Sequence, residues 1–214
     1  EAKKAQIANI PGIAVASYSL EDMVLLAGNG EQRVAKLKGV DNAWFRVSAL
    51  DSFMTDGEAS WKDNQAYTPA IMGLGVSIAL GIDVNNAFTG LKIYYPRQGA
   101  AITENPEEAL YSIVVKPEGN FRIQDEFDGQ YVLVPLEAAR HLFGAGDQFS
   151  SLEIALKPGA SEAKVRKELQ QLLGDSFSIA NRFEQNKTFF MIMKSEKWAV
   201  YAILLMVLLI ASFN

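Results

Sequence analysis

The stretch Lys194-Ser-Glu-Lys-Trp198 leads into Ala199-Val-Tyr-Ala-Ile-Leu-Leu-Met-Val-Leu-Leu-Ile-Ala-Ser-Phe213. No residue between Trp198 and Phe213 is charged. About 16 residues in a helix extend roughly 24 Å, whereas the hydrocarbon core of a bilayer is about 30 Å thick. The run is apolar on all sides, which disfavours the alternative of a buried C-terminal core helix. We therefore expect the outer half of a transmembrane helix, of which this chain holds only the start.

Four residues are expected to mark the point where the chain enters the membrane. Trp198 and Tyr201 lie where an interfacial aromatic belt would be, and Lys194 and Lys197 can extend their ammonium groups toward lipid head groups. The chain also begins at Glu1 without a methionine or a signal peptide. We therefore expect a domain that belongs to a larger membrane protein.

Composition limits the remaining classes of protein. The 214 residues are enough for one large domain or two small ones. The absence of cysteine excludes a disulfide scaffold and a thiolate metal site. The net charge is −5 with both signs interspersed, so we expect no nucleic-acid partner.

The first part of the chain predicts a helix, a strand and a hairpin. Residues 1–9 are polar and helix-prone, and Pro11-Gly12 ends them. Residues 13–20 and 23–27 are rich in small and β-branched residues, which predicts two strands. Gly28-Asn-Gly30 predicts a tight turn, so 23–40 is expected to form a hairpin.

The rest of the chain predicts a mixture of strands and helices, so the fold class is α+β. Residues 69–81 predict a strand that runs into a helix, and a helix over 136–143 ends at Gly144. A helix over 162–173 carries an apolar stripe, and one long helix is expected from Phe183 into the membrane. Further strands are predicted at 91–95, 110–116, 120–124, 131–135, 151–156 and 177–180.

Candidate reaction chemistry is sparse. Gly73-Leu-Gly75 lacks the third glycine of a dinucleotide fingerprint, because position 78 is Ile, and close helix packing explains it better. His141 is the only histidine, so a metal site or a histidine triad has too few residues. Asp125-Glu-Phe-Asp128 has no calcium-loop spacing and is interpreted as a solvated turn. We predict no catalytic, cofactor-binding or metal-binding residue, and no enzyme.

Several segments, taken in order, resemble the extracytoplasmic domain of FtsX-like ABC transporter permeases. This group includes the lipoprotein-releasing permeases and the macrolide-efflux transporter. Residues 84–88 and 116–119 depart from the pattern of the family. The segments that carry the resemblance are Ile10-Pro-Gly-Ile13, Lys38-Gly-Val-Asp41, Ala70–Gly81, Asp125–Asp128, Val132–Leu136, Ala138–Leu142, Met193–Trp198 and Ala211–Asn214.

The resemblance implies a domain placed between two transmembrane helices, on the periplasmic side of the bacterial inner membrane. It implies a porter-like α/β subdomain built from both chain ends, with an inserted β-rich part called the sabre. We assign the porter-like part to 1–52 and 150–182 and the sabre-like insertion to 53–149. Residues 183–214 are expected to form a stalk helix that runs into the truncated transmembrane helix.

The function implied by this resemblance is mechanical. A cytoplasmic ATPase subunit would hydrolyse ATP, a second permease subunit would complete the membrane part, and stalk helices would carry the movement outward. In lipoprotein-releasing permeases the loop after the corresponding strand forms a hook for a periplasmic carrier, which here is 97–108. This expectation rests on the position of the loop and on its exposed apolar residues, which lie beside acidic ones. The expected partner-binding residues are Arg97, Gln98, Ala100, Ala101, Ile102, Glu104 and Pro106.

Three alternatives to lipoprotein release stay open at this stage. In drug or toxin efflux, the same domain would meet an outer-membrane exit protein. As a cell-division regulator, it would bind a murein hydrolase or its activator and transport nothing. A soluble enzyme with an apolar C-terminus is the third alternative, and the lack of reactive motifs weighs against it.

Overall fold

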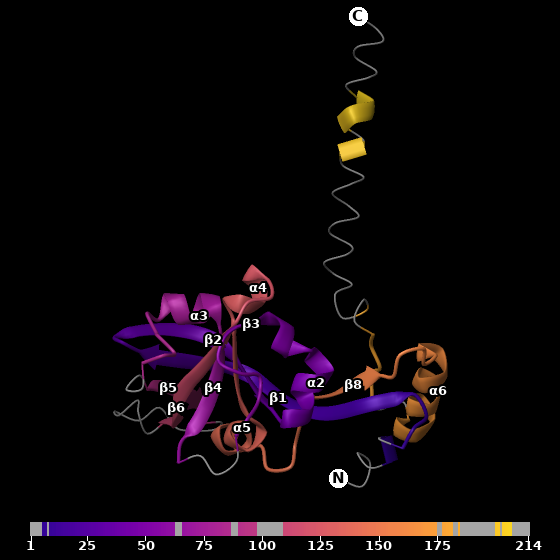
Figure 1. Cartoon of the computed structure of the whole chain (residues 1–214), viewed down its shortest axis with the longest axis horizontal. Helices are drawn as coiled ribbons and strands as arrows, with labels where there is room; N and C mark the ends of the chain where they lie inside the picture. Colours follow the sequence, from indigo (N-terminus) through magenta and orange to yellow (C-terminus); the bar gives the residue numbers. More distant parts are fainter. Residues whose placement is uncertain are drawn as a thin grey trace, which may run out of the picture. The chain divides into compact units, whose positions relative to one another are not determined.

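The computed structural model describes residues 6–7, 9–62, 66–86, 90–97, 109–174, 177–181, 184, 200–201 and 203–206. The chain divides into two compact units, Glu1–Glu162 and Ala163–Asn214. Figure 1 shows the helices and strands of both units along the chain. The first unit contains both helices and several consecutive strands, so the predicted α+β class is confirmed.

One long strand organises the first unit. Strand β1 runs from Ile13 to Gly28 without interruption and pairs with β2, Glu31–Val40, in an antiparallel hairpin. Asn29 and Gly30 make the predicted turn with φ angles of 50° and 82°. The prediction of two separate strands at 13–20 and 23–27 is wrong.

The polar pair between those two predicted strands explains the error. Glu21 and Asp22 stay in the strand, because each side chain has a partner on a neighbouring element. Glu21 forms an ion pair with Lys38 of β2, and Asp22 accepts a hydrogen bond from the hydroxyl of Tyr95.

Six of the described strands close into a ring. The hydrogen-bonded order is β2-β7-β4-β6-β5-β1, and β1 pairs with β2 to complete the circle. The added members are β4 (Thr68–Gly73), β5 (Leu91–Pro96), β6 (Leu110–Phe121) and β7 (Tyr131–Pro135). Two short strands extend the sheet beyond the ring, β3 (Met54–Asp56) on β6 and β8 (Ser151–Leu156) on the first half of β1.

Strand β6 is continuous through Pro117, whereas the sequence predicted two strands around residues 117–119. Proline donates no backbone hydrogen bond, so it is normally confined to strand edges and bulges. The pairing with β4 shifts by one residue at this place: Ala70 lies opposite Pro117 and Ile71 lies opposite Gly119. This irregularity accommodates the proline, and the prediction of two separate strands is wrong.

The interior of the ring is filled by apolar side chains from all six strands, including Leu26, Leu37 and Met72. Helix α3, Leu74–Ala79, continues from β4, and helix α5, Leu136–Phe143, continues from β7. Since β4 and β7 are antiparallel, the two helices close opposite ends of the ring, α3 above and α5 below in Figure 1. Val76 and Leu142 are among the residues that they add to this core.

A second apolar cluster lies outside the ring. Helix α2, Asn42–Ser48, and the 3-10 helix η1, Leu50–Phe53, cover the outward faces of Leu133 and Ile71. Trp44, Phe45 and Leu50 supply the large buried side chains of this cluster. Trp61 packs against Phe45 at 5.1 Å between ring centroids.

In the second unit, helix α6, Glu162–Leu173, forms as predicted and ends at Gly174, whose φ is 72°. The predicted strand at 177–180 is wrong, because these residues have no strand pairing. Instead, the carbonyl of Ile179 accepts a hydrogen bond from Arg166. Asn181 and Glu184 then exchange backbone-to-side-chain hydrogen bonds in the pattern of a helix start.

Most of the predicted stalk and transmembrane segment lies outside the described residues. Residues 184, 200–201 and 203–206 are helical. Within the part of the chain that the structure describes, no helix is both long and apolar enough to cross a bilayer. The division of the chain into a porter-like part and a sabre-like insertion, at residues 52 and 149, stays a prediction. Strands β1 and β2 of the porter-like part belong to the same ring as strands from 53–149.

Candidate functional site

The segment expected to bind a partner joins β5 to β6. Of its predicted residues, only Arg97 lies within the described part of the chain. Gln98, Ala100, Ala101, Ile102, Glu104 and Pro106 lie outside it. The structure therefore shows the two ends of this segment and leaves its partner-binding role a prediction.

The ends of the segment are held by defined contacts. The backbone N–H of Arg97 donates to the carbonyl of Ala109 at 2.8 Å, which closes the hairpin at its base. The guanidinium of Arg97 lies 4.6 Å from the ring centroid of Tyr111, a distance typical of a cation–π contact. The two ends of the segment are therefore fixed to each other where it leaves β5 and enters β6.

Tyr95 connects that base to the ring of strands. Its hydroxyl donates to Oδ2 of Asp22 at 2.7 Å, and its aromatic ring lies 4.6 Å from that of Phe143 in α5. The side chain is 7% exposed. Strand β5 is therefore fixed to both β1 and α5 two residues before Arg97.

Of the four residues predicted at the membrane surface, Tyr201 is described. It is helical and exposed. Lys194, Lys197 and Trp198 lie outside the described residues. Their membrane role stays a prediction.

A polar cluster that the sequence did not predict joins β8 to the ring. We call Ser19, Lys38, Trp44, Ser151 and Glu153 the Glu153 cluster. Oε1 of Glu153 accepts from Oγ of Ser19 at 2.8 Å and lies 2.7 Å from Nζ of Lys38. Oε2 accepts from the indole nitrogen of Trp44 at 2.9 Å, and Oγ of Ser151 lies 2.8 Å from Oγ of Ser19. One carboxylate on β8 thereby holds side chains from β1, β2 and α2.

The electrostatics of this cluster favour its charged form. Burial alone would lower the pKa of Lys38, but the attraction of Glu153, its hydrogen bond and the more distant Glu21 outweigh that effect and raise the pKa. The ammonium also lies 5.2 Å from the ring centroid of Trp44. Lys38 is therefore a firmly protonated partner and unsuited to act as a base.

Ser17 and Asp41 extend the polar contacts to the start of α2. Oδ1 of Asp41 accepts from Oγ of Ser17 at 2.6 Å and from the backbone N–H of Trp44 at 3.0 Å. Asp41 therefore caps the helix while it is tied to β1. This fixes the helix that carries Trp44.

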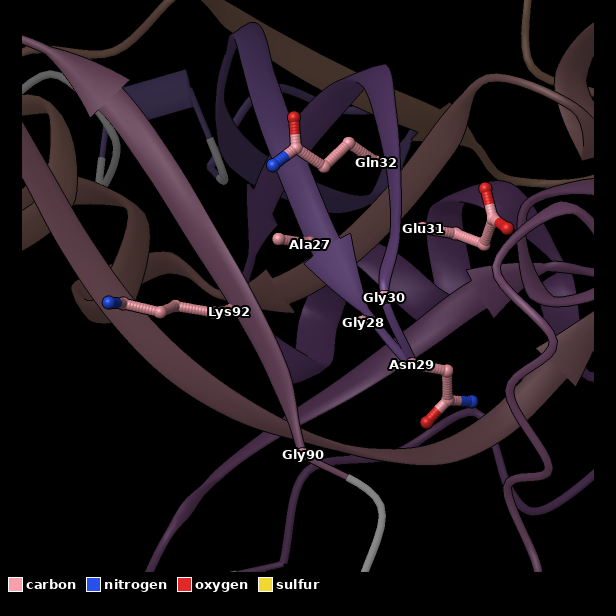
Figure 2. Close-up of a pocket in the computed structure, with 8 residues that line it drawn as sticks. All are labelled: Ala27, Gly28, Asn29, Gly30, Glu31, Gln32, Gly90 and Lys92. Carbon is pink, nitrogen blue, oxygen red and sulfur yellow. The ribbon is translucent and has the colours of Figure 1, made fainter.

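The open pocket shown in Figure 2 lies at the tip of the β1–β2 hairpin and has a volume of about 360 Å³. Gly28, Gly30 and Gly90 form part of its lining, so it offers few side chains. Lys92 and Glu31 extend in opposite directions in Figure 2. The pocket therefore presents no converging groups for a ligand or a reaction.

The remaining candidates from the sequence have structural roles. A Cβ on Gly73 or Gly75 would meet the backbone of Asp128, which confirms close packing there. Asp128 is buried and accepts from the backbone N–H groups of Ile123 and Gln124, so the solvated turn predicted for 125–128 is wrong at that residue. His141 lies exposed in the last turn of α5.

Comparisons with known proteins identify the fold. No protein-family model and no curated protein matches the chain. The chain is similar to the extracellular domain of the noncanonic ABC-type transporter YknZ from Gram-positive bacteria, with 16% identity, 82% of each chain covered and a TM-score of 0.55. It is also similar to the periplasmic region of MacB from Actinobacillus actinomycetemcomitans, with 11% identity, 80% of this chain and 71% of that chain covered, and a TM-score of 0.56. At these identities the likeness establishes a shared fold.

Proposed function

We propose that this chain is the extracytoplasmic domain of an ABC transporter permease and that it transmits movement without performing a reaction. The observation that carries the proposal is the fold shared with two transporter domains over 80% or more of this chain. The ordered resemblance of its sequence segments to FtsX-like permeases supports the same class. The apolar run from Trp198 to Phe213 supports attachment to the bacterial inner membrane, with this domain on the periplasmic side.

The described residues suit a mechanical role better than a catalytic one. Within the described ranges, no group of three or more acidic or histidine side chains has the arrangement of a metal site. The ring of strands has a continuous apolar core, and α3 and α5 contribute to it at the two ends. A tightly packed body of this kind resists deformation and moves as a unit.

The partners follow from this role. A cytoplasmic ATPase subunit would drive the full-length permease, and a second permease subunit would complete the transporter. A periplasmic carrier or exit protein would receive the substrate. Among the possible cargoes we favour lipoproteins, because the resemblance to lipoprotein-releasing permeases implies that the segment between β5 and β6 corresponds to their carrier-binding hook.

Drug or toxin efflux is the second candidate function, and it is supported by the fold shared with the MacB region. In that case an exit protein would take the place of the carrier. The two functions differ in what the segment between β5 and β6 contacts, so one experiment addresses both.

The test uses the full-length permease with its ATPase subunit in detergent. Candidate carriers and exit proteins encoded beside the permease gene are captured on the permease, with and without deletion of residues 98–107. The matched control replaces Glu31 and Gln32 at the tip of the other hairpin. We expect the deletion alone to abolish carrier capture. Undiminished carrier capture would remove the segment from the interface, and capture of an exit protein alone would favour efflux.

A permease that copurifies with no ATPase subunit would contradict the transporter assignment itself. This outcome is independent of the result for residues 98–107. The experiment therefore separates the class of protein from the role of the segment.

A further inference from the structure

Strand β8 is attached to the ring differently from the strands that form it. None of its six residues, all of which the structure describes, belongs to either apolar cluster, and none is fully buried. Strands β1, β2, β4, β5, β6 and β7 all place buried side chains in the ring core or against it. The polar contacts that attach β8 to the ring are therefore its backbone pairing with β1 and those of the Glu153 cluster.

We infer that the Glu153 cluster is a releasable connection between the ring and the chain that follows β8. Glu153 accepts hydrogen bonds from Ser19 and Trp44 and pairs with Lys38, so its two oxygens bind three elements at once. Charge-assisted contacts of this kind are strong and directional, and they are lost together when the carboxylate moves away. Separation of β8 leaves both apolar clusters intact, so it costs less than opening the ring.

The position of β8 in the chain gives this connection a consequence. After Leu156 the chain turns at Pro158-Gly159 and continues into α6. Any pull transmitted along the chain from its C-terminal part reaches the ring through β8. This consequence rests on the proposed transporter function. When the Glu153 cluster is intact, the ring follows the pull. When the cluster is open, β8 moves without the ring.

The connection itself is tested without a transporter. Hydrogen exchange is followed by mass spectrometry in the 214-residue chain and in its Glu153→Gln variant, which keeps the shape of the side chain and removes its charge. We expect exchange to accelerate about tenfold or more at the amides of 151–156 and 13–19 and to stay unchanged at 131–135. Equal acceleration in all three segments, or no acceleration, would overturn the inference.

Matched variants distinguish this effect from a general loss of stability. Lys36→Met removes a lysine from the same face of β2 whose ammonium lies 5.4 Å from the Tyr131 ring centroid, and it should leave exchange in β8 unchanged. If Glu153→Gln fails to fold, Ser19→Ala removes one donor to Glu153 and should give a smaller acceleration in the same two segments. Acceleration in β8 by Lys36→Met as large as that by Glu153→Gln would contradict the inference.

The role in transmission is tested by fixing β8 in place. Val15 and Ala155 lie opposite each other in the pairing of β1 with β8 and do not belong to the Glu153 cluster, and the chain contains no cysteine. Cysteines at both positions of the full-length permease would form a disulfide across the two strands. We expect the disulfide to reduce transport-coupled ATP hydrolysis in vesicles and a reductant to restore it. Unchanged hydrolysis with complete disulfide formation would overturn the role, whatever the exchange experiment shows.

Discussion

The backbone of Gly39 in β2 lies directly against the side chain of Ala139 in α5, so closely that a Cβ at position 39 would overlap the Cβ of Ala139. Both residues are buried. This approach brings α5 onto the end of the ring and lets Leu142 enter the core.

Gly39→Ala should therefore lower the free energy of unfolding by about 1–3 kcal/mol, because the added methyl group forces the helix away from the strand. Urea denaturation followed by circular dichroism measures the change. Gly90→Ala is the control, since a Cβ there would lie 3.6 Å from Cγ1 of Val114, an ordinary contact. An equal loss in both variants would contradict this explanation.

Removal of the Asp128 carboxylate should destabilise the fold by about 1–3 kcal/mol, because two backbone N–H groups would lose their charged acceptor. Those donors belong to Ile123 and Gln124, at 2.7 and 3.3 Å. Asp128→Ala is compared with Glu126→Ala, whose side chain is exposed in the same short helix, α4, Asp125–Asp128, and should change stability by about 0.5 kcal/mol at most. Urea denaturation measures both variants, and similar unfolding midpoints would show that Asp128 is not needed to hold the turn.

Tyr95→Phe keeps the ring contact with Phe143 and removes the hydrogen bond to Asp22. We expect a loss of about 1 kcal/mol in the free energy of unfolding. Tyr94→Phe, on the opposite face of the same strand, is the matched control. A larger loss in the control would show that the hydroxyl of Tyr95 has no special role in fixing β5.

The Lys38 pair predicts how stability depends on pH. Because the pKa of Lys38 is raised above its ordinary value of 10.5, the stabilisation is complete below that value and is lost as pH rises through the raised value. The thermal unfolding temperatures of the unmodified chain and of Lys38→Met should therefore differ most at neutral pH and converge above pH 10.5. A difference that grows with pH would contradict the ion pair as its source.

The strands and helices with strong local patterns could be predicted from the sequence. Residues 69–81 and 136–143 combine apolar residues with glycine at their ends, and both regions form the predicted elements. Strand β1 was divided wrongly because Glu21 and Asp22 resemble a polar turn when their distant partners are unknown. The closing of the ring was not predicted, since it depends on pairings between residues far apart in the chain.

The candidate site was harder to predict for the same reason. Glu153 lies in an alternating strand, where a carboxylate is normally expected to face solvent. Its partners Lys38 and Trp44 are more than a hundred residues away, and only the folded arrangement brings them together. The one available signal was the pair of serines at 17 and 19, small polar residues at alternate positions of the mainly apolar stretch 13–20.

Strand β1 has 16 residues, which at about 3.4 Å per residue make a rod roughly 50 Å long. Its first half carries β8 and its second half ends at the Asn29–Gly30 tip. Because no loop interrupts the strand, a small tilt at Ile13 would displace the tip at Asn29–Gly30 by a larger distance, as the long arm of a lever does.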